Sequence, residues 1–198
     1  MKILLIGAGG IGAWFVDELT RQIENEQFEF DEVVSIADPD LVEVEQLKYQ
    51  NFREEDVGRN KAEALAERYR VLGVEVFRAI PKKIEKESQL KGYDFFVLCV
   101  DNEATRDLVI RYCHRNGKEF IDLRATGRKI FAMPKLGTLE ENLKFVDGGD
   151  TKEYSCQDRI DLERGWVQLG NKVVAVIGVQ MLMNFQRGYG NRVISLII

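Results

Sequence analysis

The chain has 198 residues, of which 45% are hydrophobic and 31% are charged, and its formal net charge is −5. Its length suits a single domain over residues 1–198, and its hydrophobic share excludes the disordered and fibrous classes. The negative charge argues against nucleic-acid binding, and the longest apolar runs are far shorter than the ~20 residues of a membrane span. The N-terminal apolar run is also too short for a secretory signal. We therefore expect a cytoplasmic protein with neither a nucleic-acid nor a membrane partner.

Short apolar runs alternate along the chain with longer stretches of helical period. The pattern predicts strands at 2–6, 32–37, 74–78, 93–100, 119–123 and 129–133, and helices at 11–23, 61–71, 103–115 and 173–186. This order predicts an α/β fold, a three-layer Rossmann-like domain whose mostly parallel sheet carries helices on both faces. Such folds bind ligands at the carboxyl ends of their strands.

Two segments depart from this alternation. From about 135 to 170 the chain is polar and contains Gly148-Gly149-Asp150, so we expect a long polar crossover loop of little regular structure. A connection of that length, against a usual ~4–6 residues, is either functional or disordered. The last segment, 192–198, is too apolar for a free tail, and we expect it to pack as a strand on the domain or on a partner subunit.

A glycine-rich run joins the first predicted strand to the first predicted helix. Gly7 permits a tight turn, Gly9 lets a phosphate approach the backbone, and Gly12 lets the helix pack closely on the strand. The positive end of the helix dipole favours the same phosphate. The alternative is a glycine-rich turn that binds nothing, but the strand-turn-helix context favours a nucleotide.

An acidic pair ends the second predicted strand. Asp38 and Asp40 flank Pro39, and an acid at this strand end is placed to accept hydrogen bonds from ribose hydroxyls. This position suits NAD as well as ATP. Up to this point, the residues predict a mononucleotide- or dinucleotide-binding fold.

Five ordered motifs narrow that prediction. They are D-P-D-L-V-E at 38–43, L-K-Y-Q-N-F at 47–52, D-V-G-R-N-K-A at 56–62, V-D-N-E-A-T-R at 100–106 and G-N-K-V-V-A-V-I-G-V-Q at 170–180. In this order the chain resembles the ThiF/MoeB/HesA family of adenylating domains, which is related to ubiquitin-activating enzymes. The resemblance extends from residue 1 to about 185.

The resemblance implies an ATP- and Mg²⁺-dependent adenylyltransferase that activates a carboxylate, commonly the C-terminus of a ubiquitin-like or sulfur-carrier protein. It implies that Asp38 holds the ribose, Lys61 contacts the phosphates and Asp101 helps to hold Mg²⁺. It adds further nucleotide contacts, at Gly7, Gly9, Gly10, Gly12, Asp40, Gln46, Gln50 and Asn102. Taken without the motifs, Lys61 is equally a solvated surface lysine and Asp101 an ordinary helix N-cap. The family also implies a homodimer or heterodimer.

Several positions depart from the family pattern. Gln46 stands where relatives carry asparagine, and Tyr49 stands where they carry an arginine that supports the triphosphate. Lys48 and Arg53 are near enough in sequence to replace that charge. The two CxxC pairs of many relatives are absent, so we expect no zinc. We also expect neither the family's N-terminal helix nor a further domain after the last predicted helix.

One cysteine and one histidine are the remaining candidates for chemistry. Cys156 falls in the polar segment where relatives carry a reactive cysteine, so it is a candidate nucleophile; the alternative is an incidental loop cysteine beside acidic residues. His114 is the sole histidine, and its polar surroundings predict a surface or helix-end residue.

Two other functions remain open. The missing arginine suits a nucleotide-binding but catalytically weak subunit that supports a partner. A nicotinamide-dependent oxidoreductase would use the same glycine loop and Asp38, but it leaves the D-V-G-R-N-K-A segment unexplained.

Overall fold

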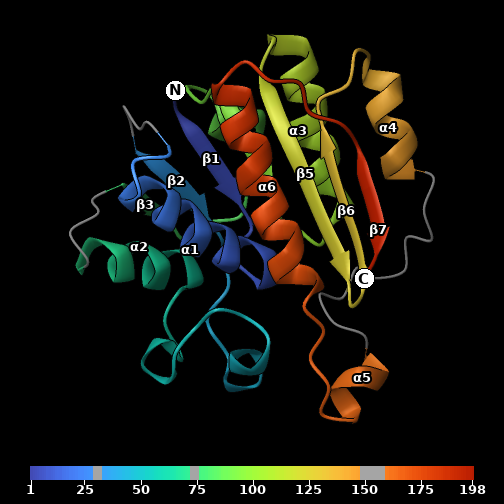
Figure 1. The fold of residues 1–198 in the computed structure, drawn as a ribbon. Helices are drawn as coiled ribbons and strands as arrows, with labels where there is room; N and C mark the ends of the chain where they lie inside the picture. Colours follow the sequence, from blue (N-terminus) through green and yellow to red (C-terminus); the bar gives the residue numbers. More distant parts are fainter. Residues whose placement is uncertain (29–32, 72–75, 148–158) are drawn as a thin grey trace.

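In a computed structural model, which describes residues 1–28, 33–71, 76–147 and 159–198, the strands form a single seven-stranded sheet (Figure 1). The strand order is β3-β2-β1-β4-β5-β6-β7. The strands are β1 (Ile3–Ile6), β2 (Val34–Ala37), β3 (Phe77–Ile80), β4 (Phe95–Leu98), β5 (Glu119–Thr126), β6 (Lys129–Pro134) and β7 (Ile194–Ile197). The first five are parallel, whereas β6 pairs antiparallel with β5 and β7. The predicted mostly parallel α/β fold is therefore confirmed.

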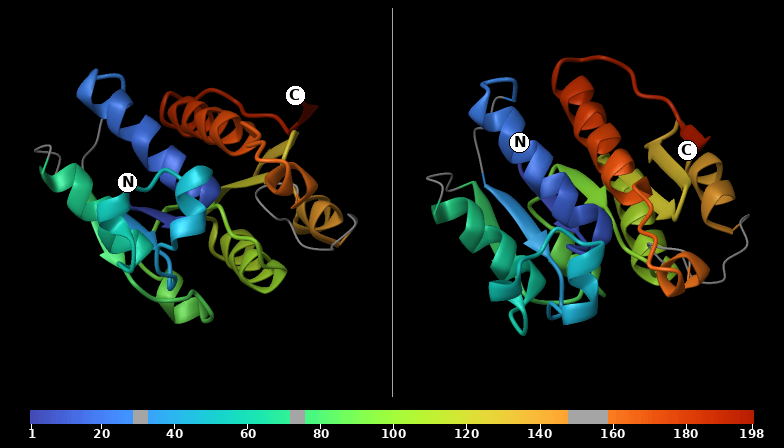
Figure 2. Two further views of the ribbon diagram at one scale, coloured as in Figure 1. Left: turned by 90° about the horizontal axis from the view of Figure 1, so that it is seen from below. Right: turned by 60° about the horizontal axis from the view of Figure 1, so that its bottom comes forward.

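Helices cover both faces of the sheet (Figures 1 and 2). They are α1 (Gly10–Glu24), α2 (Lys61–Val71), α3 (Glu103–Asn116), α4 (Leu139–Asp147), α5 (Arg159–Glu163) and α6 (Gly170–Gln186). Short 3₁₀ turns lie at η1 (Val44–Lys48), η2 (Glu54–Asp56) and η3 (Glu87–Leu90). Helices α1, α2 and α6 pack on one face, and α3 with α4 packs on the other. Within the described ranges, no helix has the length and hydropathy to cross a membrane.

The central strands are buried on both faces, which explains their continuous apolar runs. In β1, Ile3 and Leu5 join the core beneath α1 and α6, whereas Leu4 and Ile6 join the core beneath α3. Successive side chains of a strand point to opposite faces, so a fully buried strand needs an apolar residue at every position. This packing holds the carboxyl ends of β1, β2 and β4 side by side at one edge of the sheet.

The structure differs from the sequence-based expectations in the polar segment and at the start of β3. The polar segment is not wholly irregular, because α4 and α5 lie within it. In α4, Leu139, Leu143 and Val146 share one face that packs beside α3, and this short apolar stripe is easily missed among its acidic residues. β3 begins at Phe77, later than predicted. β7 pairs with β6 of the same chain, which confirms the expected packing of the C-terminal strand on the domain.

Candidate functional site

A cavity of about 500 Å³ opens at the carboxyl edge of the sheet, where β1, β2 and β4 end. It brings together predicted residues from segments far apart in the sequence, namely Gly7, Gly9, Gly10, Asp38, Asp40, Gln46, Gln50, Lys61, Asp101 and Asn102. Gly12 lies behind this lining, in the first turn of α1. Cys156 falls outside the residues that the structure describes, so its nucleophilic role stays a prediction.

The glycine loop has the predicted close packing. Gly7 has φ +95°, and a Cβ on it would lie 2.6 Å from the carbonyl oxygen of Cys99. A Cβ on Gly12 would lie 2.0 Å from the carbonyl oxygen of Gly7, so only glycine lets α1 start this close to the turn. Helix α1 has no side-chain cap at Gly9 and no acid in its first turn. Its N-terminal amides therefore present a positive dipole end without a side-chain cap at the edge of the cavity.

Asp38 ties the end of β2 to the glycine loop. Its Oδ2 accepts a hydrogen bond from the backbone N–H of Ala8 at 2.6 Å, and its Oδ1 accepts one from Asp40 N–H at 2.8 Å. The side chain is buried, and burial raises the pKa of the carboxyl, although these hydrogen bonds and nearby Lys61 lower it. Each carboxylate oxygen can accept a second hydrogen bond, so the group can hold the loop and a ligand hydroxyl together.

Lys61 is not the surface lysine of the alternative interpretation. Its side chain is only 5% exposed, and its Nζ lies 3.6 Å from Oδ2 of Asp40. Asn60, which the sequence analysis did not single out, sets this position. Its Nδ2 donates to the carbonyls of Asp38 (2.9 Å) and Asp40 (3.1 Å), and its Oδ1 accepts from the first amides of α2. Asparagine directly before a helix is a common N-cap, which was the available signal.

A buried ion pair braces the loop that precedes Lys61. Oδ2 of Asp56 lies 2.5 Å from a guanidinium nitrogen of Arg68 in α2, and it also accepts the backbone N–H of Arg53. The same guanidinium donates to the carbonyl of Asn51 at 2.9 Å. The side chains of Asp56 and Arg68 are 4% and 9% exposed. The aspartate of the D-V-G motif is therefore structural, and it fixes the path of the chain into α2.

Asp101 and Asn102 are adjacent but have different positions in the structure. Asn102 is the N-cap of α3, since its Oδ1 accepts the backbone N–H of Thr105 at 2.9 Å. The N-cap interpretation of Asp101 is therefore wrong. The Asp101 side chain is exposed at the rim of the cavity. The described residues contain no group of three metal-ligating side chains, but Mg²⁺ on a nucleotide needs only one or two carboxylates beside the phosphates. Asp101 fits that requirement.

The two glutamines behave differently. Gln46 is held locally, because its Nε2 donates to Oε2 of Glu43 at 3.1 Å and its Oε1 accepts the Glu43 N–H. Gln50 is buried beneath the cavity, near Gly9, and its Oε1 has no hydrogen-bond partner in the described part of the chain. Unpaired buried acceptors are rare in folded proteins. Gln50 is therefore the better candidate for a ligand contact.

Part of the positive charge of the site comes from two lysines that the sequence analysis missed. Lys82 and Lys83, just after β3, line the cavity with Lys61. Lys48 and Arg53, the nearby candidates to replace the family arginine, do not line the cavity, and Arg53 pairs with Glu55 at 3.2 Å. The three lysines face three aspartates in the lining, at 38, 40 and 101, so the charges of the cavity balance. Only the fold brings the segment after β3 to this edge.

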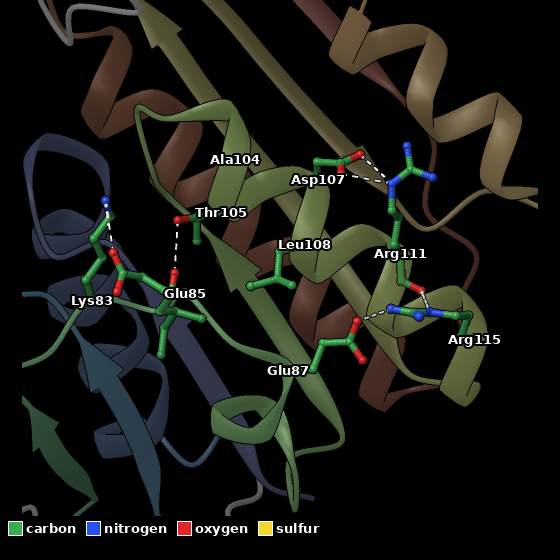
Figure 3. Close-up of a pocket in the computed structure, with 10 residues that line it drawn as sticks. Lys83, Glu85, Glu87, Ala104, Thr105, Asp107, Leu108, Arg111 and Arg115 are labelled. Carbon is green, nitrogen blue, oxygen red and sulfur yellow. Dashed lines mark hydrogen bonds and ion pairs between the residues drawn. The ribbon is translucent and has the colours of Figure 1, made fainter.

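A second pocket of about 450 Å³ adjoins the cavity, between the segment after β3 and α3 (Figure 3). Both share Lys83, Ile84 and Thr105, and the Thr105 hydroxyl donates to the Ile84 carbonyl at 3.1 Å. The charged groups of this second pocket pair with one another, as Lys83–Glu85, Glu87–Arg115 and Asp107–Arg111. The residues of the second pocket therefore form part of the wall of the first cavity. Because their charges are paired, little charge remains to bind a ligand in the second pocket.

The described cysteines and the histidine have structural surroundings. Cys99 lies at the end of β4 in the cavity lining, whereas Cys113 is buried in α3, where burial raises the pKa of its thiol. His114 is half-buried, with Nε2 2.8 Å from Oδ1 of Asn142 in α4. The expected helix-end position of His114 is therefore confirmed, because it lies in the last turn of α3, and its contact with Asn142 joins α3 to α4.

Comparisons with known proteins bear on the family and the fold of the chain. A model described as the ThiF family matches residues 1–195. A tRNA threonylcarbamoyladenosine dehydratase from Haemophilus influenzae is 26% identical over 136 residues, which are 63% of this chain and 48% of that protein. The SUMO-activating enzyme subunit uba-2 of Caenorhabditis elegans is 30% identical over 164 residues, 80% of this chain and 25% of that protein. The chain thus spans about half, or less, of the length of these relatives.

Solved structures show the same fold. E. coli MccB with succinimide is 19% identical, has a TM-score of 0.73, and its alignment covers 100% of this chain and 60% of MccB. E. coli MccB with ATP is 21% identical and has a TM-score of 0.70 over the same shares. At such identities the likeness establishes the architecture alone.

Proposed function

The chain belongs to the ThiF family, and from that premise we propose that it binds ATP with Mg²⁺ and transfers the adenylyl group to a carboxylate. The observation that carries the proposal is the meeting, at one cavity, of the uncapped start of α1, buried Asp38 and buried Lys61. These groups suit, respectively, phosphates, ribose hydroxyls and the charge of a phosphoryl centre. The structure of MccB with ATP, which shares this fold, supports the choice of nucleotide.

In the proposed complex, the phosphates lie over the glycine loop and the ribose lies against Asp38. Gln50 turns its unpaired amide oxygen toward a nucleotide hydroxyl or amine, since a phosphate has no hydrogen to donate. Asp101 would hold Mg²⁺ together with the phosphates, and the ion would neutralise part of the phosphate charge. The lysines at 82 and 83 offset part of the negative charge of the aspartates in the lining.

The reaction is a substitution at the α-phosphorus of ATP. A carboxylate oxygen forms a bond to this phosphorus, the bond to the bridging oxygen of the β-phosphate breaks, and pyrophosphate leaves with the electron pair. Lys61 donates to the phosphate oxygens that gain charge in the transition state. It requires no movement to do so, because Asp40 and Asn60 already hold it in place.

For the carboxylate we propose the C-terminus of a ubiquitin-like or sulfur-carrier protein, in a homodimeric or heterodimeric assembly. Uba-2, whose printed name is that of a SUMO-activating enzyme subunit, supports this class of substrate. A second candidate is a catalytically weak subunit that binds nucleotide and supports a partner. The observation in its favour is Tyr49, which replaces the family arginine and does not line the cavity.

Two measurements test the proposal. Thermal unfolding with ATP and Mg²⁺ should raise Tm by several degrees at ~100 times the dissociation constant, whereas NAD should not. Exchange of labelled pyrophosphate into ATP, measured with a panel of carboxylate substrates, should be lost in Lys61→Ala and retained in Lys91→Ala, an exposed lysine outside the cavity. An ATP shift without exchange in the wild-type protein would favour the supporting subunit. A shift with NAD alone would refute both candidates.

A further inference from the structure

Strand β3 forms one edge of the sheet, and within the part of the chain that the structure describes it pairs only with β2 (Figure 1). The backbone amide of Asp38, just after β2, donates to the carbonyl of Ile80 at 3.2 Å. In a strand, the N–H and C=O groups of one residue point to one side and those of the next residue point to the other. The peptide groups of Phe77 and Ala79 therefore point away from β2, toward the open edge.

Two cavities flank this edge, one on each face of the sheet. The first, of about 610 Å³, lies between β3 and α2, on the face where the side chains of Phe77 and Ala79 join the core. The second, of about 530 Å³, is lined by Ser35, the register partner of Leu4 on the opposite face. Arg78 lines both cavities, and no described residue lines either of them together with the nucleotide cavity. A strand added beside β3 would direct alternate side chains toward the two cavities.

The first cavity offers an apolar wall with largely compensated charge. Phe77 lies in this wall, and two arginines of the lining have carboxylate partners. Arg70 pairs with Glu67, and Arg59 lies 3.9 Å from Asp56. This cavity therefore suits an apolar side chain better than a charged one.

The second cavity is positive. Its described lining includes Lys2 and Arg78 and contains no acid. Arg78 is exposed and makes no ion pair with a described residue. The carboxylate of Asp94, which follows a lining residue in the chain, already accepts the backbone amide of Lys2 at 3.0 Å and the ammonium of Lys118 at 2.9 Å. The charge of Arg78 is therefore available to a carboxylate on this face.

We propose that β3 binds an extended peptide segment of a partner protein as an additional strand, with acidic side chains on the Arg78 face and apolar side chains on the α2 face. Main-chain hydrogen bonds to Phe77 and Ala79 hold the segment, and the two cavities select its side chains. A second copy of this chain is a poorer occupant, because pairing through β3 would bring two Arg78 side chains together on one face. This docking site goes beyond the proposed function and lies at a different edge of the sheet from the nucleotide cavity.

Nuclear magnetic resonance of the isotope-labelled protein tests the proposal, with acetyl-Val-Glu-Val-Glu-Val-amide as the probe. We expect saturable shifts of the Phe77 and Ala79 backbone amides. The matched peptide with lysine in place of glutamate should bind at least tenfold more weakly. No shift at these amides, or equal binding of the two peptides, would overturn the proposal. The titrations contain no nucleotide, and the Gly9 amide, titrated with ATP and Mg²⁺, reports separately on the proposed function.

Two N-methylated forms of the probe test the main-chain contacts. One is methylated at the valines and the other at the glutamates. Because only every second N–H group of a paired strand faces its neighbour, one form should bind β3 and the other should not. Equal binding of the two forms would show that the peptide does not pair as a strand.

Substitutions give a second readout. We expect Arg78→Glu to prefer the lysine peptide, whereas Arg21→Glu, at an exposed arginine of α1 outside both cavities, should keep the wild-type preference. Ala79→Pro removes the outward N–H group but no hydrogen bond to β2, so it should weaken binding of the glutamate probe. An unchanged preference in Arg78→Glu would contradict the proposal, and Arg78 would then only protect a sheet edge from aggregation.

Discussion

The ammonium of Lys61 and the carboxylate of Asp40 form an asymmetric pair, 3.6 Å apart, in which the lysine side chain is 5% exposed and the aspartate 67% exposed. A buried ammonium with one solvated partner is an unfavourable arrangement for stability alone. The same arrangement favours the binding of a second anion, because the ammonium is already buried and held in place. The unequal burial of this pair is therefore the main observation that favours a catalytic role for Lys61 over a structural one.

Replacing Lys61 with methionine should separate stability from activity. Methionine has a similar length and removes a charge that is buried at a cost, so the free energy of unfolding should change by no more than about 1 kcal/mol. Pyrophosphate exchange should fall by ~10²–10³, the usual loss for one donor to a transition-state charge. Urea unfolding and exchange assays measure the two quantities. A large loss of stability with normal exchange would make Lys61 a structural residue.

Asp38→Asn should destabilise the protein, because the amide presents one acceptor to the two backbone donors of Ala8 and Asp40. The expected cost is ~1–3 kcal/mol. Burial raises the folded-state pKa of this carboxyl, so its pH-dependent contribution to stability is present below the unfolded pKa. That contribution is lost as pH rises through the folded pKa. The difference in free energy of unfolding between the wild type and Asp38→Asn should therefore decrease as the pH rises above about 4. An increase of this difference with pH would contradict the prediction.

Asp56→Ala should cost ~3–5 kcal/mol, because it leaves the guanidinium of Arg68 buried without its anion. Arg68→Ala should cost a similar amount, and the double variant should cost less than the sum, since the two residues form one unit. Denaturant unfolding measures all three. Glu67→Ala, which breaks an exposed pair with Arg70, is the control and should change stability by less than ~0.5 kcal/mol. Additive losses would show that the brace is not a coupled pair.

Asp101 and Asn102 should respond differently although they are adjacent. Asn102→Ala removes the cap of α3 and should lower stability by ~1 kcal/mol without altering the Mg²⁺ requirement of exchange. Asp101→Asn should leave stability nearly unchanged, since its side chain is exposed, and should raise the Mg²⁺ concentration needed for half-maximal exchange. Mg²⁺ titrations of the two variants give the comparison. A shared response would argue against a separate metal role for Asp101.

The sequence by itself determined the architecture and most of the cavity lining. Buried parallel strands need apolar residues at every position, so β1 and β4 were visible as continuous runs, and the glycines at 7 and 12 marked a turn that admits no side chain. The sequence also predicted that the acids at the strand ends lie at one site, because parallel strands bring their carboxyl ends to one edge of the sheet. These features depend on local pattern and on the topology it implies.

Only the tertiary structure decided which polar residues have partners. The brace of Asp56 by Arg68 and the burial of Lys61 depend on segments that meet through folding, and no spacing along the chain encodes them. The same is true of Lys82 and Lys83, which reach the cavity because β3 lies beside β2. Asn171 is the clearest case: its sequence context is that of an ordinary helix start, but its side-chain amide is buried and has no hydrogen-bond partner among the described residues.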